Sequence, residues 1–367
     1  MIFVTGATGY LGGYALVELA QRTDSDFALL VRARDDAEAR AKLWRGLQLH
    51  MDREGFEALW PRLVVFKGDL HGPRLGLSDA DRDRLTAEVD SVLHIAASLN
   101  RKSAKACLNT NLRGTLSVIR LAREIADRSG MRRYSHVSTV AVAGHRSREV
   151  VEEDSAIDWD RSDYDPYGRT KKFCEHMAHE LLPDVQRTIF RPSIVMGDTR
   201  HPRTSQFDMV QATAIMADLP AVPLAPSDRL DIVPADWVGR AIATVHLAPE
   251  PAHTIYHLSS GRNAPTAGDI GRALKAGIGR RPRFVRALEK PFDLAFRGMN
   301  RLPRGNPLQA TGALMKVFMP YITYDTVFTN ERIVAEVGEA PASFATYGVE
   351  LYRWAKANGF AYPYVDL

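Results

Sequence analysis

Residues 1–20 constrain the fold of this chain more than any other stretch. An apolar, β-branched run at residues 2–5 is followed at once by a turn with glycine at positions 6, 9 and 12, and then by an apolar helical pattern. This order is typical of a phosphate site, because the glycines allow a tight turn and a close backbone approach. An ordinary turn rich in glycine is the alternative, and the position directly after an opening strand disfavours it. Gly6 permits the tight turn, Gly9 lets backbone N–H groups approach a pyrophosphate, and Gly12 lets the helix pack close to the strand. We therefore predict that a phosphate-bearing cofactor binds at Thr5, Gly6, Thr8, Gly9, Tyr10, Leu11 and Gly12.

Strand-like and helix-like stretches alternate over the first half of the chain. Helical patterns separate five further apolar runs, at residues 27–31, 63–66, 91–95, 134–137 and 188–192. This alternation predicts an α/β fold with a Rossmann-type, doubly wound parallel sheet.

The rhythm weakens after residue 195, where proline and alanine become frequent. We assign residues 1–195 to the nucleotide-binding domain and expect residues 231–260, which include one more strand, to return to it. Residues 196–230 and 261–367 are expected to form a smaller, mainly helical substrate-binding or lid region.

Composition excludes several classes of protein. The net charge of +4 over 367 residues is too small to indicate nucleic-acid binding, and Cys107 and Cys174 alone form neither a disulfide framework nor a zinc motif. The histidine pairs at 176/179 and 253/257 have no evident third ligand, so we expect no metal site. The first strand begins at residue 2, and no apolar run approaches the roughly 20 residues of a membrane span. We therefore expect a soluble, cytoplasmic protein.

Basic residues follow the second predicted strand, where a domain that prefers NAD usually carries an acidic residue. Arg32, with Arg34 as the second candidate, therefore favours the 2′-phosphate of NADP, and Lys42 and Arg45 in the next helical stretch are further candidates. A solvated basic turn is the alternative.

Two more strand ends contribute to the same predicted site. Asp69 and Leu70 follow the third strand, where the carboxylate is placed to accept a hydrogen bond from the adenine amino group; capping a turn is the alternative role. Ala96 and Ala97 follow the fourth strand, and their small side chains let a cofactor lie across the sheet edge.

Tyr167 and Lys171 lie four residues apart in a helical pattern, so they share a face. An ammonium group beside a phenol favours the phenolate, which suits the tyrosine to proton transfer. Thr139 or Ser138 at the end of the fifth strand offers a second hydrogen bond to a substrate oxygen. A tyrosine–lysine pair at this spacing is common by chance, so the pair by itself carries little weight.

Eight motifs follow one another along the chain: TGATGYLG at 5–12, LVRAR at 30–34, GDL at 68–70, NLRGT at 111–115, HVST at 136–139, YGRTK at 167–171, RPS at 191–193 and DIV at 231–233. Together they resemble the motifs of the extended short-chain dehydrogenases/reductases over residues 1–260. Within that superfamily the chain is most similar to the thioester-reductase and fatty-acyl-CoA-reductase branch, whose nucleotide-binding domain is of the male-sterility type.

The resemblance implies an NADPH-dependent oxidoreductase that transfers hydride to a carbonyl, of an acyl thioester or the derived aldehyde. Tyr167 would supply the proton, Thr139 would help to hold the oxyanion, and Lys171 would lower the tyrosine pKa and bind the ribose. Asn111 would hold a water behind Lys171; an ordinary helix residue bonded to the backbone is the alternative. The resemblance also implies cofactor contacts at Pro192 and Ser193.

Three other functions stay open at this point. One is a reductase of a lipophilic hydroxy or keto compound, of the hydroxysteroid or dihydroflavonol type. The second is a sugar-nucleotide epimerase, which Arg32 disfavours. The third is a non-catalytic NADP sensor, which the presence of Tyr167, Lys171 and Thr139 disfavours because a sensor needs no proton donor. The apolar stretch at residues 291–322 fits a lid packed on the core, a substrate tunnel or a membrane-surface contact. Whether the chain forms a homodimer is a further open question.

Overall fold

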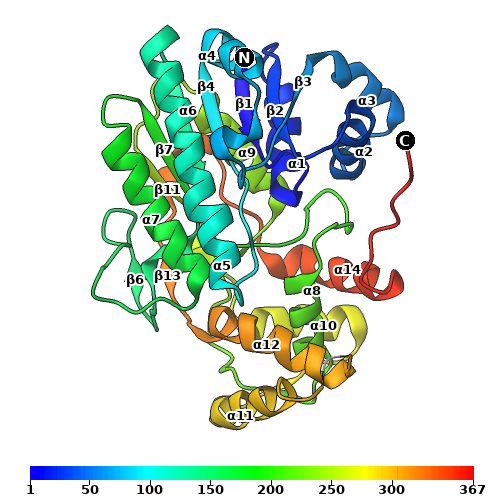
Figure 1. The fold of residues 1–367 in the computed structure, drawn as a ribbon. Helices are drawn as coiled ribbons and strands as arrows, with labels where there is room; N and C mark the ends of the chain where they lie inside the picture. Colours follow the sequence, from blue (N-terminus) through cyan, green and yellow to red (C-terminus); the bar gives the residue numbers. More distant parts are fainter. Residues whose placement is uncertain (304) are drawn as a thin grey trace.

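A seven-stranded parallel sheet forms the centre of the computed structural model, which describes residues 1–303 and 305–367 (Figure 1). Each neighbouring pair of strands runs parallel, in the order β11-β7-β5-β4-β1-β2-β3. The predicted doubly wound α/β fold is therefore confirmed. The strands are β1 (Ile2–Thr5), β2 (Phe27–Val31), β3 (Leu63–Lys67), β4 (Ser91–His94), β5 (Arg133–Val137), β7 (Arg187–Pro192) and β11 (Ile255–Leu258).

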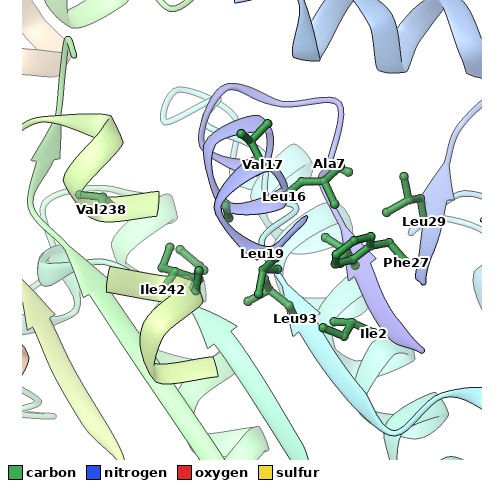
Figure 2. Packing of buried hydrophobic residues seen from close by; sticks show 14 of the residues in the cluster. Ile2, Ala7, Leu16, Val17, Leu19, Phe27, Leu29, Leu93, Val238 and Ile242 are labelled. Atoms are coloured by element: carbon green, nitrogen blue, oxygen red, sulfur yellow. The ribbon is translucent and has the colours of Figure 1, made fainter. Parts of the chain in front are cut away.

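Helices cover both faces of the sheet, which explains why its strands are almost continuously apolar in sequence. Figure 2 shows Leu16 and Leu19 of α1 packed with Ile242 of α9, beside Phe27 and Leu93 of the strands. Three other helices, α4, α6 and α7, pack on the opposite face. The bounds are α1 (Tyr10–Ala20) and α9 (Ala235–Leu247) on one face, and α4 (Asp79–Glu88), α6 (Gly114–Ser129) and α7 (Pro166–Leu181) on the other.

The charged stretch after β2 is helical, as predicted. It forms α2 (Asp36–Leu47) and α3 (Arg53–Leu59), and each begins at an aspartate, Asp35 or Asp52, that accepts a hydrogen bond from a first-turn N–H. Trp44 and Phe56 pack together against the core below them. This pair of helices lies beside the β3 end of the sheet (Figure 1) and packs into the same apolar cluster as α1 and α9.

The helical region after β4 has an irregular beginning. A short α5 (Ala104–Ala106) leads into a π-helical segment, Cys107–Arg113, and the regular α6 starts only at Gly114. A wider π turn displaces the side chains that follow it and is frequent at functional sites. Here it contains Asn111, which faces the turn after β4.

The C-terminal part is mainly helical and has its own apolar core, with Met315 and Ile322 of α12 buried in it. α11 and α12 pack against each other, while Leu294 and Leu308 are exposed. Arg304, within the stretch 291–322, lies outside the described residues. The helices are α8 (Asp208–Asp218), α10 (Ala267–Ile278), α11 (Glu289–Met299), α12 (Pro307–Thr323), α13 (Glu331–Val337) and α14 (Phe344–Ala357).

Three small parallel strand pairs lie outside the main sheet. They are β8 (Ile194–Val195) with β10 (Ile232–Val233), β9 (Ala221–Val222) with β12 (Arg283–Phe284), and β6 (Val150–Val151) with β13 (Val327–Phe328). The pair β6 with β13 joins the first part of the chain to the C-terminal part. Residues 231–260 contribute β11 to the sheet and α9 to its face, whereas the domain division at residue 195 stays a prediction. None of the described helices is both long enough and apolar enough to cross a membrane.

Candidate active site

A cavity of about 620 Å³ lies at the carboxyl ends of the central strands, where α12 of the C-terminal part also reaches it. In an open parallel sheet this edge, on either side of β1, is where ligands bind. The cavity collects most of the predicted site residues: Thr5, Gly6, Thr8, Gly9, Tyr10, Leu11, Gly12, Arg32, Asp69, Leu70, Ala96, Ala97, Ser138, Thr139, Tyr167, Lys171, Pro192 and Ser193. The individual roles of these residues stay predictions.

The glycine turn has no room for a Cβ atom at Gly6 or Gly12. Gly6 has φ +84°, and a Cβ on it would lie 2.7 Å from the backbone nitrogen of Ala96. A Cβ on Gly12 would lie 1.9 Å from the Gly6 carbonyl oxygen, so the helix can approach the turn only without one. The N-cap of α1, Gly9, offers no side-chain cap among the described residues, and the first turn carries no acidic residue. The helix N-terminus thus keeps N–H groups and a positive dipole end for an anion.

The opposite side of the cavity also suits a dinucleotide. Ser193 follows β7, and its backbone N–H donates to the Leu258 carbonyl at 3.0 Å. Its hydroxyl is buried and has no hydrogen-bond partner within residues 1–303 and 305–367. A buried hydroxyl normally has a partner, and the candidates here are the Asp231 carboxyl, whose pKa the Ser193 side chain lowers, and a ligand in the cavity that Ser193 lines.

The basic residues after β2 differ in their distance from the cavity and in their hydrogen-bond partners. Arg32 lines the cavity with its side chain 75% exposed, and it lies 3.9 Å from the Asp69 carboxylate. Lys42 donates to the Arg32 carbonyl at 2.6 Å and lines a second cavity next to the first. Arg34 lies outside both cavities and is bound to Glu38 through two hydrogen bonds of 2.9 Å. The structure therefore brings Arg32 and Lys42 together and leaves Arg34 on the surface.

Tyr167 lies in the first turn of α7, because Asp165 caps this helix and Pro166 starts it. The tyrosine side chain is only 6% exposed. Lys171, one turn later, is buried and donates from Nζ to the Val137 carbonyl at 2.6 Å. This bond fixes the ammonium group at the end of β5, and burial lowers the Lys171 pKa.

Thr139 leaves β5 and accepts a hydrogen bond from the Ala141 N–H at 3.2 Å. The same loop is close to α7, because Gly168 approaches the Ala141 carbonyl and a Cβ there would lie 3.0 Å from that oxygen. A side-chain interaction with Thr139 lowers the Tyr167 pKa, although burial raises it more strongly. The Thr139 and Tyr167 hydroxyls thus lie close enough to interact.

Sequence reasoning missed Arg101. Its guanidinium carbon lies 4.4 Å from the centroid of the Tyr167 ring and 4.5 Å from that of Tyr321 in α12. One nitrogen donates to Asp165 at 3.1 Å and to the Tyr321 hydroxyl at 2.5 Å, and that hydroxyl donates to Asp165 at 2.8 Å. Burial raises the Tyr167 pKa, and the positive charge of Arg101 is the largest influence that opposes this shift.

The available sequence signal for Arg101 is weak. It is a basic residue shortly after the small-residue turn that follows β4, at the ligand-bearing edge of the sheet. Its partner Tyr321 is 220 residues away in the sequence. From the sequence we expected Lys171 to lower the Tyr167 pKa. In the structure, the cation that stacks on the Tyr167 ring is Arg101.

Two predicted catalytic residues are held by other protein groups. The Ser138 hydroxyl donates to the Glu175 carboxylate, which forms a buried ion pair with Arg191 at 2.6 Å. The Asn111 side chain accepts from the Ser98 N–H at 2.7 Å and donates to the Ser98 carbonyl at 3.2 Å. Both residues thus hold the strand ends in place, and for Asn111 this matches the alternative of a residue bonded to the backbone.

The described residues contain no cluster of three or more metal-ligating side chains. The side-chain groups that line the cavity and could act on a ligand include hydroxyl, ammonium, guanidinium, carboxylate and imidazole groups.

Comparison with known proteins identifies the family. The NAD-binding family described as male sterility protein matches residues 4–242. The chain is 31% identical over 275 residues to a linear gramicidin synthase protein of Brevibacillus parabrevis, covering 74% of this chain and 5% of that protein. It is 29% identical over 288 residues to a carboxylic acid reductase of Mycobacterium tuberculosis, covering 70% of this chain and 24% of that protein. The chain thus spans a small part of these relatives.

A solved structure has the same fold. The terminal R domain from the myxalamid PKS-NRPS biosynthetic pathway superposes with a TM-score of 0.83 at 24% identity, covering 98% of this chain and 91% of that domain. The predicted resemblance to the male-sterility-type branch is confirmed: the chain belongs to the male sterility protein family of NAD-binding domains.

Proposed function

We propose that this chain is an NADPH-dependent reductase that transfers hydride to the carbonyl carbon of an acyl thioester, or of the aldehyde derived from it. The observation that carries the proposal is the grouping of Thr139, Tyr167 and Lys171 in the cavity that also contains the glycine turn. A proton donor, a second hydroxyl and a cation at one end of a dinucleotide-sized cavity suit carbonyl reduction.

Each protein group has a distinct task in this reaction. The bound nicotinamide supplies the hydride. Tyr167 donates its phenolic proton to the carbonyl oxygen, and Thr139 donates a second hydrogen bond to that oxygen as negative charge develops. Lys171, oriented by the Val137 carbonyl, has further N–H donors for the cofactor ribose. Arg101 stabilises the tyrosinate that remains after proton transfer.

The chemistry of the reaction and the names of the relatives support the proposed substrate class. Reduction of a thioester gives a hemithioacetal, which collapses to an aldehyde and a free thiol; a second hydride and proton convert the aldehyde to an alcohol. The matched relatives include a carboxylic acid reductase and a gramicidin synthase, and the superposed structure is a terminal domain of a synthetase pathway. These names support an acyl group bound to a carrier as the substrate.

The preference for NADPH is supported by the basic residues at the adenosine end. Arg32 lines the main cavity, and Lys42 lines the neighbouring one. An arginine at this position accommodates a 2′-phosphate, whereas an acidic residue would bind the ribose 2′-hydroxyl of NADH.

The test is oxidation of NADPH in the presence of acyl-CoA thioesters, aldehydes and ketones, with the wild-type chain and Tyr167→Phe. We expect turnover of thioesters or aldehydes, and a loss of at least about 100-fold in kcat for Tyr167→Phe, because a general acid contributes that much. NADPH binding by the variant should be retained. Tyr164→Phe is the matched control, since the Tyr164 hydroxyl bonds the Arg146 backbone, and it should keep turnover.

Two results would contradict the proposal. Full activity of Tyr167→Phe would exclude this tyrosine as the proton donor. Turnover of ketones without any turnover of thioesters or aldehydes would replace the proposed substrate class with the hydroxy/keto class.

A further inference from the structure

The C-terminal segment, residues 361–367, returns from α14 to the nucleotide-binding part of the molecule and ends beside α2 and α3 (Figure 1). The Trp44 indole N–H donates to the Val365 carbonyl at 2.7 Å. The Gln48 side chain accepts from the Val365 N–H at 2.8 Å and donates to its carbonyl at 3.2 Å. The Val365 side chain is 65% exposed, so backbone hydrogen bonds rather than apolar burial hold the segment there.

The segment also satisfies groups that α2 would otherwise leave unpaired. Trp44 is buried, and an indole N–H without a partner in such a place would be costly. The Tyr362 hydroxyl adds a hydrogen bond to the Gln48 carbonyl at 3.2 Å, and the Tyr362 ring packs 4.8 Å from that of Tyr364. Contacts of Tyr362 and Val365 with α2 and the residue after it thus fix the position of the segment on both sides of Tyr364.

Tyr364 in turn contacts a cation. The guanidinium carbon of Arg45 lies 4.1 Å from the Tyr364 ring centroid. A guanidinium that stacks on a ring by its face keeps its N–H edge free for an anion. Within the described part of the chain, no carboxylate lies within 4.0 Å of Arg45, whereas Lys42 pairs with Glu38 at 2.8 Å. Arg45 is therefore the least neutralised cation of this helix end.

Lys42, Arg45 and Tyr364 line one cavity of about 440 Å³ beside the glycine turn. Its wall includes Arg32, Lys42 and Arg45 and, among the described residues, no acidic side chain. The wall shares Thr8, Gly9, Tyr10, Arg32 and Gln206 with the 620 Å³ cavity, so the two spaces adjoin at the helix N-terminus. An anion attached to the adenosine end of a dinucleotide would therefore meet this basic space.

We propose that the C-terminal segment completes the binding site for the 2′-phosphate of NADPH, with Tyr364 holding Arg45 in place to bind that phosphate. The inference rests on the proposed use of NADPH. It makes a residue near the end of the sequence a determinant of cofactor specificity, although the nucleotide-binding motifs all lie in the first part of the chain.

The test compares dissociation constants for NADPH and NADH, measured by direct binding to the full chain without substrate. The quantity of interest is the ratio of the NADH to the NADPH constant. We expect Tyr364→Ala to lower this ratio about 3- to 10-fold through weaker NADPH binding, the range for losing a cation–π contact and the phosphate contact that it orients. NADH binding should stay unchanged.

Four further variants sharpen the test. Arg45→Ala should lower the ratio at least as much, and adding Tyr364→Ala to it should have little further effect, because both act through one contact. Tyr364→Phe keeps the ring and should keep the ratio. Asp366→Ala changes the charge of the same segment and should also keep the ratio.

The possible results separate this inference from the proposed function. If Arg32→Ala lowers the ratio while a folded Tyr364→Ala protein keeps it, the role of the C-terminal segment is refuted and the use of NADPH stands. If the wild-type chain does not prefer NADPH, both are refuted. Should Tyr364→Ala unfold, Tyr364→Leu replaces it, because leucine keeps an apolar side chain at this position and removes the ring, and an unchanged ratio there refutes the inference equally.

Discussion

Replacing Arg101 with methionine tests how the site controls the proton of Tyr167. Methionine keeps an unbranched side chain between the Tyr167 and Tyr321 rings and removes the positive charge. The guanidinium carbon lies 4.4 Å from the Tyr167 ring centroid, where two unit charges interact by about 4 kcal/mol at an effective dielectric constant of about 20.

The neighbouring carboxylate reduces this value. Asp165 lies 3.1 Å from the guanidinium and acts on the tyrosinate with the opposite sign. If it cancels about half of the Arg101 contribution, roughly 2 kcal/mol of tyrosinate stabilisation is lost in Arg101→Met, which corresponds to about a 30-fold lower kcat.

The variant should also have a different pH profile. Tyr167 must carry its proton to act as the acid, so reduction slows as pH rises through the tyrosine pKa. Burial already raises that pKa and Arg101 opposes the shift, so removing the arginine should move the decline in kcat to higher pH. The assay is kcat for NADPH oxidation across the alkaline range, with NADPH binding measured separately.

Two controls decide the interpretation. Arg101→Lys restores a positive charge and should restore much of the wild-type profile. Lys102→Met removes a charge one residue away and should leave the profile unchanged. A lower kcat for Arg101→Met with an unshifted profile would refute the electrostatic role and leave a purely structural contribution.

Two further predictions concern folding and cofactor binding. Burial raises the pKa of Asp231 to about 7, so the folded state favours its protonated form, and the protein loses stability as pH rises from the usual carboxyl pKa of 3.8 through 7. Asp231→Asn should therefore be more stable than the wild type at pH 8, by roughly 2–4 kcal/mol, and lose this advantage below pH 4 in denaturant titrations; an advantage independent of pH would contradict the assignment. Gly12→Ala should abolish NADPH binding and lower the Tm, because its Cβ would lie 1.9 Å from a backbone oxygen, whereas Gly298→Ala, with no described atom within 4 Å, should bind normally. Normal NADPH binding by Gly12→Ala would show that the helix can move away from the turn.

Local patterns in the sequence were sufficient for much of the fold. Buried strands of a parallel sheet are short apolar runs, and the glycines of the first turn report a backbone that excludes Cβ atoms. The helical spacing of Tyr167 and Lys171 places both on one face, and both line the same cavity. The start of the helix after β4 was harder, because a π turn at Cys107–Arg113 has no distinct periodicity in a short stretch.

The sequence by itself determined the order of strands and helices, the glycine turn and the threonine, tyrosine and lysine of the candidate site, since each depends on neighbours within a few residues. Only the tertiary structure decided which distant side chains meet in the candidate site and beside it. Arg101 meets Tyr321 across 220 residues, and Val365 meets Trp44 across 321. Ser138, although adjacent to Thr139, is held by Glu175 of another element. The physical reason is that stacking and hydrogen bonding between distant segments depend on how the helices pack, which no local spacing records.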